Sequence, residues 1–270
     1  MLAKYESHVD SYKDRLCPFY VHYRCRAFNA VCNWHANIEI ILVLEGNGEV
    51  QYGTDVLEIR AGDVVVFNPN VLHRFYKSDT IVYHCIIVDE KFCNENGIFT
   101  EPLLFEKKFR STETERLCKN AAQCYMRYKA DGTVISGAKT RNAVLALLID
   151  LYENHLVKQS CSDSRGTNRP EGHVKKTAAY LIEHCTEPVN LDDLARLCGI
   201  SKCHLSREFK RYTGQSILTY INLIRCKYAE QCMLSGMTVT ETAMECGFES
   251  VSYFSRTYKK LMGSNPSKVK

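Results

Sequence analysis

The pattern of hydrophobic and polar positions first has the short period of strands. Between residues 33 and 75, apolar residues alternate with polar ones, as in EVQYG, or form short runs such as DVVVF. GNG, AGD and NPN interrupt these runs, and such sequences are typical of tight turns. Short strands separated by glycine-containing turns predict a β-barrel or jelly roll in this part of the chain.

The spacing then becomes helical. Apolar residues recur every three or four positions over 111–130 and 138–157, which predicts two helices on either side of DGTVISG. We expect these helices to form the contact between two copies of the chain, with Leu145, Leu148 and Tyr152 on it. The alternative is that the same apolar stripe covers the barrel of its own chain.

The C-terminal region contains a repeat. LCGISKCHLSREFKRYTG at 197–214 resembles ECGFESVSYFSRTYKKLMG at 245–263. Two copies separated by about 50 residues predict a duplicated supersecondary unit. A shift of 48 positions, and of 49 after one inserted residue, pairs identical residues at Ala195 and Ala243, Cys198 and Cys246, Gly199 and Gly247, Ser201 and Ser250, Ser206 and Ser255, Arg207 and Arg256, Lys210 and Lys259, and Gly214 and Gly263.

Each copy carries the signals of a helix, a turn and a second helix. A capping residue followed three positions later by an acid opens the first helix, a glycine ends it, and a serine caps the second. This order is that of a helix-turn-helix unit. The residues are Asn190, Asp193, Gly199 and Ser201 in the first copy, and Thr238, Glu241, Gly247 and Ser250 in the second.

The second helix of each copy separates an apolar face from a polar one. Leu205 and Phe209, like Phe254 and Tyr258, are predicted to lie in the core. Short polar residues beside an arginine allow a helix to enter the major groove, where a guanidinium can contact O6 and N7 of guanine. Lysines further along the helix suit phosphate oxygens. The alternative, two solvated hairpins with ordinary basic faces, does not account for the duplication. The predicted DNA face consists of Cys203, Ser206, Arg207 and Lys210, with Ser252, Ser255, Arg256 and Lys259 as the counterparts.

Length and composition limit the class of protein to which the chain can belong. At 270 residues, with 45% hydrophobic and 24% charged residues, the chain is typical of a soluble globular protein of two domains. No apolar run is long enough to cross a membrane, and no signal region follows Met1. The 14 cysteines are spread along the chain without a C-x-x-C pair, which favours reduced thiols in the cytoplasm over a secreted disulfide scaffold.

Charge is unevenly distributed between the two halves. Residues 173–270 carry a net charge of +5 and residues 1–172 a net charge of −1, so the repeated region is expected to bind a polyanion. Between them, KQSCSDSRGTNRPEG has the composition of a linker. We therefore predict an effector-binding and dimerisation domain at 1–157, a linker at 158–172 and a DNA-binding domain at 173–270.

The C-terminal region resembles the DNA-binding domain of AraC/XylS-type transcription regulators. The similarity covers about the last 100 residues and includes FK, GQS, YI, the GF-S-YF-R-YK pattern and a final G-x-x-P. It implies a long helix at 216–235 that holds two recognition helices in successive major-groove segments about 34 Å apart. By position, the resemblance implies base contacts from Lys202, Cys203, Ser206 and Arg207, and from Val251, Ser252, Ser255 and Arg256.

The N-terminal region resembles a cupin, which is the usual effector-binding domain of this regulator family. The similarity rests on WH-x-x-x-E, a glycine seven residues after the glutamate, and the later AGD, NP and His73. Cupin enzymes bind a metal through two histidines and a glutamate of the first motif and a histidine of the second. The matching residues here are His35, Glu39 and His73, with Asn33 in place of the first histidine.

These three residues leave two uses open. Three ligands can hold a metal with open coordination positions, but histidine and glutamate can equally form hydrogen bonds to a sugar or an acid. We expect a pocket for a polar small molecule, such as a sugar, without a metal or another cofactor. Arg24, in YVHYRCRA, is a further candidate for this pocket.

Together these observations predict an effector-responsive, sequence-specific transcription regulator. It is expected to form a homodimer, to bind double-stranded DNA in the major groove, and to contact RNA polymerase if it is an activator. No catalytic residue and no membrane partner are predicted. The alternative is a metal-dependent cupin enzyme fused to a DNA-binding domain, which the substitution of asparagine at position 33 disfavours.

Overall fold

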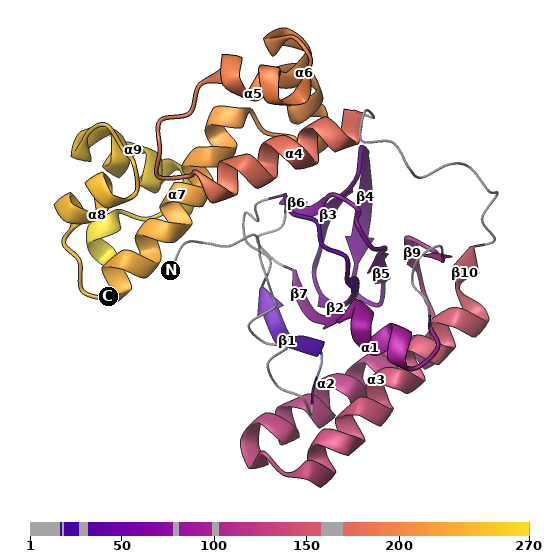
Figure 1. Ribbon diagram of the computed structural model, residues 1–270. Helices are drawn as coiled ribbons and strands as arrows, with labels where there is room; N and C mark the ends of the chain where they lie inside the picture. Colours follow the sequence, from indigo (N-terminus) through magenta and orange to yellow (C-terminus); the bar gives the residue numbers. More distant parts are fainter. Residues whose placement is uncertain are drawn as a thin grey trace. The chain divides into compact units, whose positions relative to one another are not determined.

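The described residues form two compact units, the first rich in strands and the second helical (Figure 1). The computed structural model describes residues 17, 19–26, 32–77, 81–98, 103–157 and 170–269. A strand-rich region followed by two helices, and then an all-helical region, confirms the predicted fold class. No helix within these ranges is both long and apolar enough to cross a membrane.

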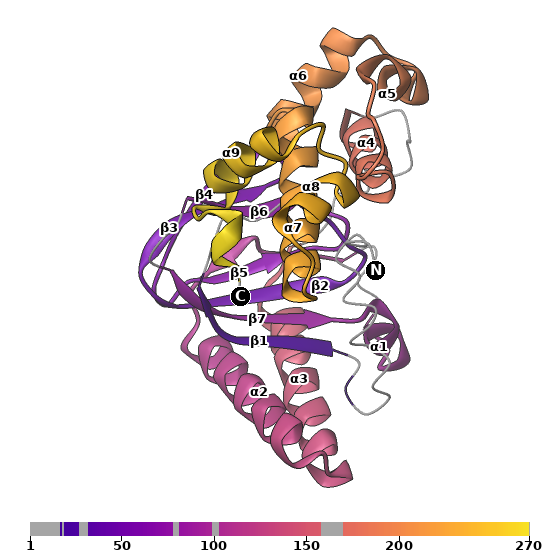
Figure 2. The same cartoon turned by 90° about the vertical axis from the view of Figure 1, so that its left-hand side faces the viewer.

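Two antiparallel sheets build the N-terminal unit. The larger has the order β1-β7-β2-β5-β9, of which β1, β7, β2 and β5 can be followed in Figure 2. The smaller has the order β4-β3-β6, and β8 pairs with β10. The strands are β1 (Phe19–Arg26), β2 (Ile38–Glu45), β3 (Asn47–Tyr52), β4 (Asp55–Arg60), β5 (Val64–Phe67), β6 (His73–Lys77), β7 (Val82–Val88), β8 (Leu104–Phe105), β9 (Lys108–Phe109) and β10 (Leu156–Val157).

Strand β2 is buried on both faces, which explains its nearly continuous apolar sequence. Successive side chains of a strand point to opposite faces. Ile41 and Val43 belong to a core between the two sheets. Ile38 and Ile40 belong to a second core, formed with the helices on the outer side of the larger sheet. Glu39 has the same orientation as Ile41 and therefore points between the sheets.

The outer face of the larger sheet is covered by α2 (Thr112–Asp131) and α3 (Val134–Asn154), while α1 (Glu90–Glu95) follows β7. Helix α3 begins four residues before the predicted start. The hydroxyl of Thr133 accepts a hydrogen bond from the Ser136 amide at 3.1 Å, so that the residues after it form a first helical turn. The helix also ends at Asn154, because Leu156 and Val157 pair with β8.

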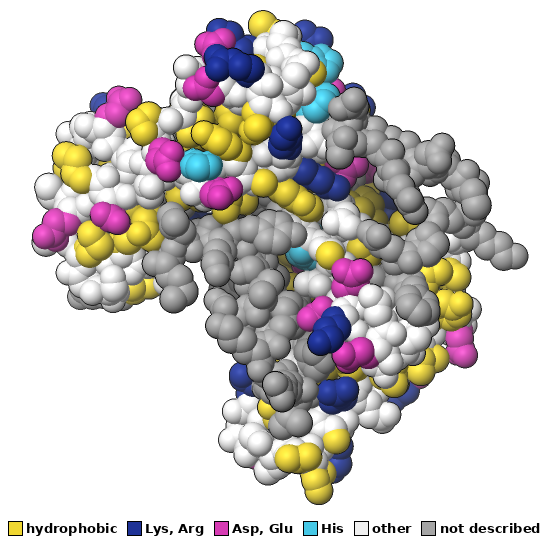
Figure 3. Space-filling view, viewed as in Figure 1, with side chains coloured by type: hydrophobic (Ala, Val, Ile, Leu, Met, Phe, Trp, Pro, Cys, Tyr) yellow, Lys and Arg dark blue, Asp and Glu magenta, His cyan; other side chains and the backbone are white. Residues whose placement is uncertain are grey.

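The apolar stripe of α3 packs mainly on its own sheet. Leu148 is completely buried in the core below the helices, so its predicted place on a dimer contact is wrong. Leu145 is half-buried, whereas Ile149 and Tyr152 are exposed. Apolar side chains are also visible at the lower end of this unit, over the α2–α3 hairpin (Figure 3). Only the outer part of the stripe remains available to a partner.

The C-terminal unit contains two helix-turn-helix units joined by one long helix. Helices α5 and α6 form the first unit, which packs on α4, and α8 and α9 form the second. Helix α7 joins them and spans nearly the predicted 216–235. The bounds are α4 (Pro170–Glu183), α5 (Leu191–Cys198), α6 (Lys202–Thr213), α7 (Ile217–Leu234), α8 (Val239–Glu245) and α9 (Val251–Met262), followed by a 3-10 turn (Pro266–Lys268).

The turns of the two copies have the same hydrogen bonds. The amide of Ile200 donates to the carbonyl of Ala195 at 3.1 Å, and the amide of Phe248 donates to the carbonyl of Ala243 at 3.0 Å. Between these residues, Gly199 and Gly247 have φ angles of +69° and +73°, a region that favours glycine. The repeat seen in the sequence is therefore a repeat of backbone structure.

The helix caps largely follow the prediction. Ser201 and Ser250 cap α6 and α9, and Thr238 and Glu241 form a reciprocal capping box at α8. The first copy differs, because Asn190 accepts from the amide of Asp192. Its Asp193 forms an ion pair with Arg196 and does not reach back to the cap.

A buried arginine connects the parts of this unit. On α7, the guanidinium of Arg225 donates from Nε to the carbonyl of Cys185 at 2.6 Å and from Nη2 to that of Glu187 at 2.8 Å. The same guanidinium lies 5.8 Å from the ring centre of Phe248 in the second turn. Arg225 thus fixes the segment after α4 and the turn of the second copy to one helix.

Candidate functional site

The predicted DNA face lies on the exposed sides of α6 and α9. Leu205 and Phe209 are buried, as are Phe254 and Tyr258, so the expected core faces are confirmed. Most of the predicted contact residues are exposed, namely Lys202, Cys203, Ser206, Arg207 and Lys210 on α6, and Ser252, Arg256 and Lys259 on α9, whereas Val251 and Ser255 are half-buried.

The two arginines at equivalent positions are accessible. Neither Arg207 nor Arg256 forms a salt bridge with any other residue that the structure describes. Each therefore presents five N–H donors without a competing intramolecular carboxylate. Such a guanidinium suits two acceptors in one plane, as a guanine edge provides.

Lys202 differs from the other cations of this face. Its ammonium lies 2.9 Å from Oδ1 and 3.1 Å from Oδ2 of Asp192 on α5. The hydrogen bond and the charge of Asp192 raise the pKa of Lys202. A contact between Lys202 and DNA would have to replace this ion pair. The partner, ten residues away on the preceding helix, was not foreseen from the sequence.

The inner side of α6 holds a carboxylate that sequence reasoning missed. Glu208 is buried, and its two oxygens contact Nδ1 of His173 at 3.2 Å and Nε2 of His204 at 3.1 Å. Because His173 belongs to α4, this contact fixes the recognition helix to its support. The spacing of Leu205, Glu208 and Phe209 was the available signal, since it places Glu208 on the buried face.

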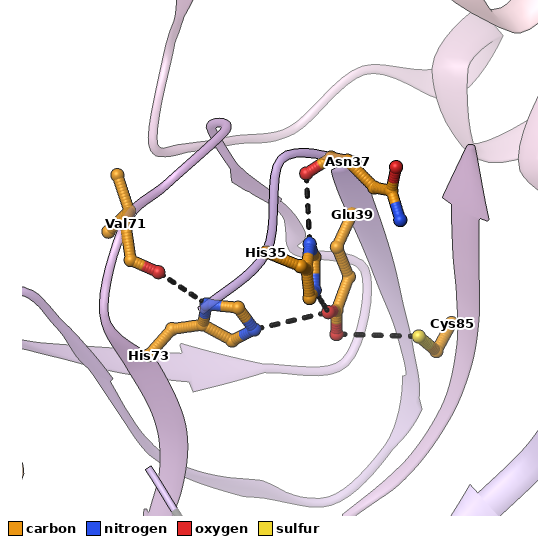
Figure 4. A network of polar contacts seen from close by, with 6 residues as sticks. All are labelled: His35, Asn37, Glu39, Val71, His73 and Cys85. Carbon is orange, nitrogen blue, oxygen red and sulfur yellow. Dashed lines mark hydrogen bonds and ion pairs between the residues drawn. The ribbon is translucent and has the colours of Figure 1, made fainter. Parts of the chain in front are cut away.

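The second candidate site lies between the two sheets of the N-terminal unit. Glu39 is on β2, His73 begins β6, and His35 precedes β2. The Nε2 atoms of His35 and His73 lie 3.0 Å and 3.1 Å from the same oxygen, Oε2 of Glu39 (Figure 4). All three residues are buried, with exposed fractions of 4%, 8% and 4% for His35, Glu39 and His73. The structure thus brings together three of the four candidates proposed for this site.

The surroundings hold these side chains in place. Nδ1 of His35 lies 3.0 Å from the carbonyl oxygen of Asn37, and Nδ1 of His73 lies 2.8 Å from that of Val71 (Figure 4). The thiol of Cys85, which was not predicted, donates to Oε1 of Glu39 at 3.4 Å. The phenyl ring of Phe67 stacks on the imidazole of His73 at 4.2 Å.

The ionisation of Glu39 reflects opposing influences. Burial is the strongest of them and disfavours the charged form, which raises the pKa. The charge of His73 and the hydrogen bonds of both imidazoles act in the opposite direction and together outweigh burial, so the pKa of Glu39 lies well below 4.5. The carboxylate therefore keeps its negative charge as long as positive charge lies beside it.

The fourth candidate, Arg24, lies on β1 as a strand residue. Its side chain is outside the described residues, so the structure places only its backbone. The twelve cysteines whose side chains the structure describes form no disulfide with one another. Burial raises the pKa of Cys93 and of Cys226 to about 12, which makes these thiols unreactive at neutral pH.

Comparison with known protein families accounts for both regions. The family "AraC-like ligand binding domain" matches residues 16–146, and the family "Helix-turn-helix domain" matches residues 194–270. The chain belongs to the AraC family of transcription regulators. The strand-rich unit of this AraC-family protein is thus a ligand-binding domain of the AraC type, and its helical unit is a helix-turn-helix domain.

Individual relatives of this AraC-family protein are also regulators by name. The transcriptional activator Btr of Bacillus subtilis (strain 168) is 28% identical over 225 residues, which cover 80% of this chain and 41% of Btr. The regulator YdeC of the same organism is 22% identical over 263 residues, which cover 88% of this chain and 85% of YdeC. The chain therefore spans less than half of Btr but most of YdeC.

One solved structure aligns with most of the chain. ToxT from Vibrio cholerae, crystallised with an unsaturated fatty acid, aligns with 93% of this chain and 94% of its own, at 15% identity and a TM-score of 0.48.

Proposed function

We propose that this AraC-family protein is a sequence-specific DNA-binding regulator of transcription, located in the cytoplasm and without enzymatic activity. The duplicated helix-turn-helix carries this proposal. Two recognition helices have the same caps and the same core positions, and each presents an exposed arginine at the equivalent place, Arg207 and Arg256.

The two helices provide the groups that major-groove recognition requires. Near the start of each helix, short side chains precede the arginine, so that the backbone can approach the bases while the guanidinium contacts a guanine edge. Lys210 and Lys259, one turn later, are placed for phosphate oxygens. The contribution of Lys202 is reduced by its ion pair with Asp192.

Selection from a random duplex library at about 150 mM salt tests this function. The full chain is expected to enrich a two-part motif whose elements are about one helical turn apart. The double variant Arg207→Ala/Arg256→Ala serves as the control. Equal enrichment by both proteins would count against sequence-specific recognition by these helices.

We further propose that the N-terminal unit binds a polar small molecule near His35, Glu39, His73 and Arg24. The grouping of three of these residues between the sheets supports this role. A screen of sugars and small organic acids would measure the change in DNA affinity of the full chain. An active compound should lose its effect in His73→Ala. An unchanged response in that variant would place the effector elsewhere.

A homodimer contact is proposed on the outer side of α3, and RNA polymerase is a further partner if the protein activates transcription. Ile149 and Tyr152 are 44% and 48% exposed, and they follow the half-buried Leu145 by four and seven residues. Ile149→Asp/Tyr152→Asp should convert the dimer to a monomer in sedimentation experiments. Val56→Asp replaces an equally exposed apolar residue on β4 and should leave the dimer intact. A double variant that still sediments as a dimer would exclude this surface.

We also propose two independent domains, 1–157 and 173–270, joined by a linker at 158–172. Residues 158–169 of this linker lie outside the described residues, and its last three residues already belong to α4. The polar, Ser- and Gly-containing sequence of the linker supports this division. Limited proteolysis should cut there first and release a C-terminal fragment that still binds DNA. First cuts within 33–90 would contradict the proposed boundary.

A further inference from the structure

The positions of protons in the His35–Glu39–His73 cluster present a conflict. In each histidine, Nδ1 faces a backbone carbonyl oxygen, which can only accept a hydrogen bond. A neutral imidazole has one N–H group, so Nδ1 must carry it and Nε2 must present a lone pair. Both lone pairs then point at Oε2 of Glu39, which is itself an acceptor. Three electron-pair donors therefore converge without a proton between them.

Moving protons within the cluster does not resolve this conflict. A protonated Glu39 has one O–H group and could donate to only one of the two rings. The other tautomer would turn a lone pair of Nδ1 toward the carbonyl of Asn37 or of Val71. Protonation of both rings would satisfy every contact, but it would bury two separate positive charges beside one carboxylate. A divalent cation gives the cluster the same net charge, but a single ion then contacts all three ligand atoms directly.

The geometry points to a site for a divalent transition-metal ion, bound by Nε2 of His35, Nε2 of His73 and Oε2 of Glu39. Zinc is bonded to imidazole nitrogen and carboxylate oxygen at about 2.0–2.1 Å, so two ligands lie roughly 3.3–3.4 Å apart at the tetrahedral angle and roughly 2.8–3.0 Å apart at a right angle. The two measured separations from Oε2 are 3.0 Å and 3.1 Å. The three ligand atoms all lie within 4.8 Å of one another.

The surroundings of the cluster are those of a metal ligand set. Histidines that bind metals usually donate their second N–H to a carbonyl or carboxylate, which orients the ring. Asn37 and Val71 provide such carbonyls here, and the thiol of Cys85 occupies the other oxygen of Glu39. Two imidazoles and one carboxylate suit zinc, iron and related ions, and three protein ligands leave coordination positions open. From the sequence we expected a pocket without a metal. The hydrogen bonds that fix the proton positions of the two imidazoles cannot be derived from the sequence.

Zinc titration of the full chain, prepared without a histidine tag, tests this site. Competition against a chromogenic chelator should show one Zn²⁺ per chain. His35→Ala and His73→Ala should each weaken binding more than about 100-fold, beyond the 10–100-fold effect of losing an outer partner. His84→Ala is the matched control, because His84 is also 4% exposed but lies next to Cys85 on the opposite face of β7. It should leave the affinity unchanged.

Two further measurements test the site even if the alanine variants do not fold. Co²⁺ added to the unaltered chain should give visible absorption bands of a coordinated ion, which Zn²⁺ should abolish. Glu39→Gln keeps the side-chain shape and should weaken Zn²⁺ binding more than about tenfold.

The proposal would be overturned if the unaltered chain bound no more Zn²⁺ than a His35→Ala/His73→Ala variant. Equal affinity in the unaltered chain and in His73→Ala would do the same. The cluster would then be a network with both rings protonated. DNA binding enters none of these measurements, so this inference and the proposed DNA-binding function fail or succeed separately.

Discussion

Replacing Arg207 or Arg256 by alanine is expected to weaken binding to a cognate duplex by about 1–3 kcal/mol, or roughly 5- to 150-fold. The loss follows from the geometry of the guanidinium, which can contact two acceptors of one guanine in a way that no shorter side chain replaces. Both arginines are exposed and, within the described ranges, free of salt bridges. Titration of the selected duplex and of a scrambled one measures the effect.

Lys259→Ala provides the comparison for a phosphate contact. This variant should bind all duplexes more weakly by a similar factor, and the slope of affinity against salt should fall by about one. The arginine variants should instead lose affinity for the cognate duplex while binding to the scrambled duplex changes little. A similar loss on both duplexes in the arginine variants would show that α6 and α9 do not read bases through these residues.

Gly247→Ala is expected to destabilise the helical unit by about 2–5 kcal/mol, whereas Gly199→Ala, at the equivalent position, should cost only about 1–2 kcal/mol. Both glycines have positive φ, so both variants carry the strain of a left-handed residue. A Cβ atom at position 199 meets no atom within 4 Å. One at position 247 would lie 2.3 Å from the carbonyl oxygen of Thr186.

The difference between the two glycines depends on the immobility of the segment after α4. Thr186 lies between Cys185 and Glu187, whose carbonyls both accept hydrogen bonds from Arg225. The backbone therefore cannot move away from an added methyl group without losing buried hydrogen bonds. Urea unfolding of the full chain, followed by far-ultraviolet circular dichroism, compares the two variants. Equal midpoints for their helical transitions would contradict the close packing of this turn.

Signals that act over a few residues were readable from the sequence. Ser201, Ser250 and the Thr238–Glu241 pair predicted the starts of three helices because a cap contacts amides two or three positions away. The start of α3 was missed, since Thr133 was assigned to a turn although it caps the helix. Two hydrophobic residues at the right spacing can face a sheet or a partner, so the pattern alone did not place Leu148.

Contacts between segments that are far apart in the chain were harder to predict from the sequence. The pairing of Lys202 with Asp192 and of Glu208 with His173 joins side chains whose proximity follows from helix packing. The family resemblance brought His35, Glu39 and His73 together as candidates. It did not show that both imidazoles turn Nδ1 toward carbonyls, which is the observation that favours a cation.

The attachment of both helix-turn-helix units to α7, reinforced by Arg225, has a consequence for target sites. A DNA-binding protein whose two units are joined by a flexible linker tolerates variable spacing between its two recognition sequences. When both units are fixed to a single helix, the distance between them cannot increase. Inserting about five base pairs between the two elements would turn the second element to the opposite side of the duplex. Promoters controlled by this protein should therefore diverge in the bases of the gap while conserving its length.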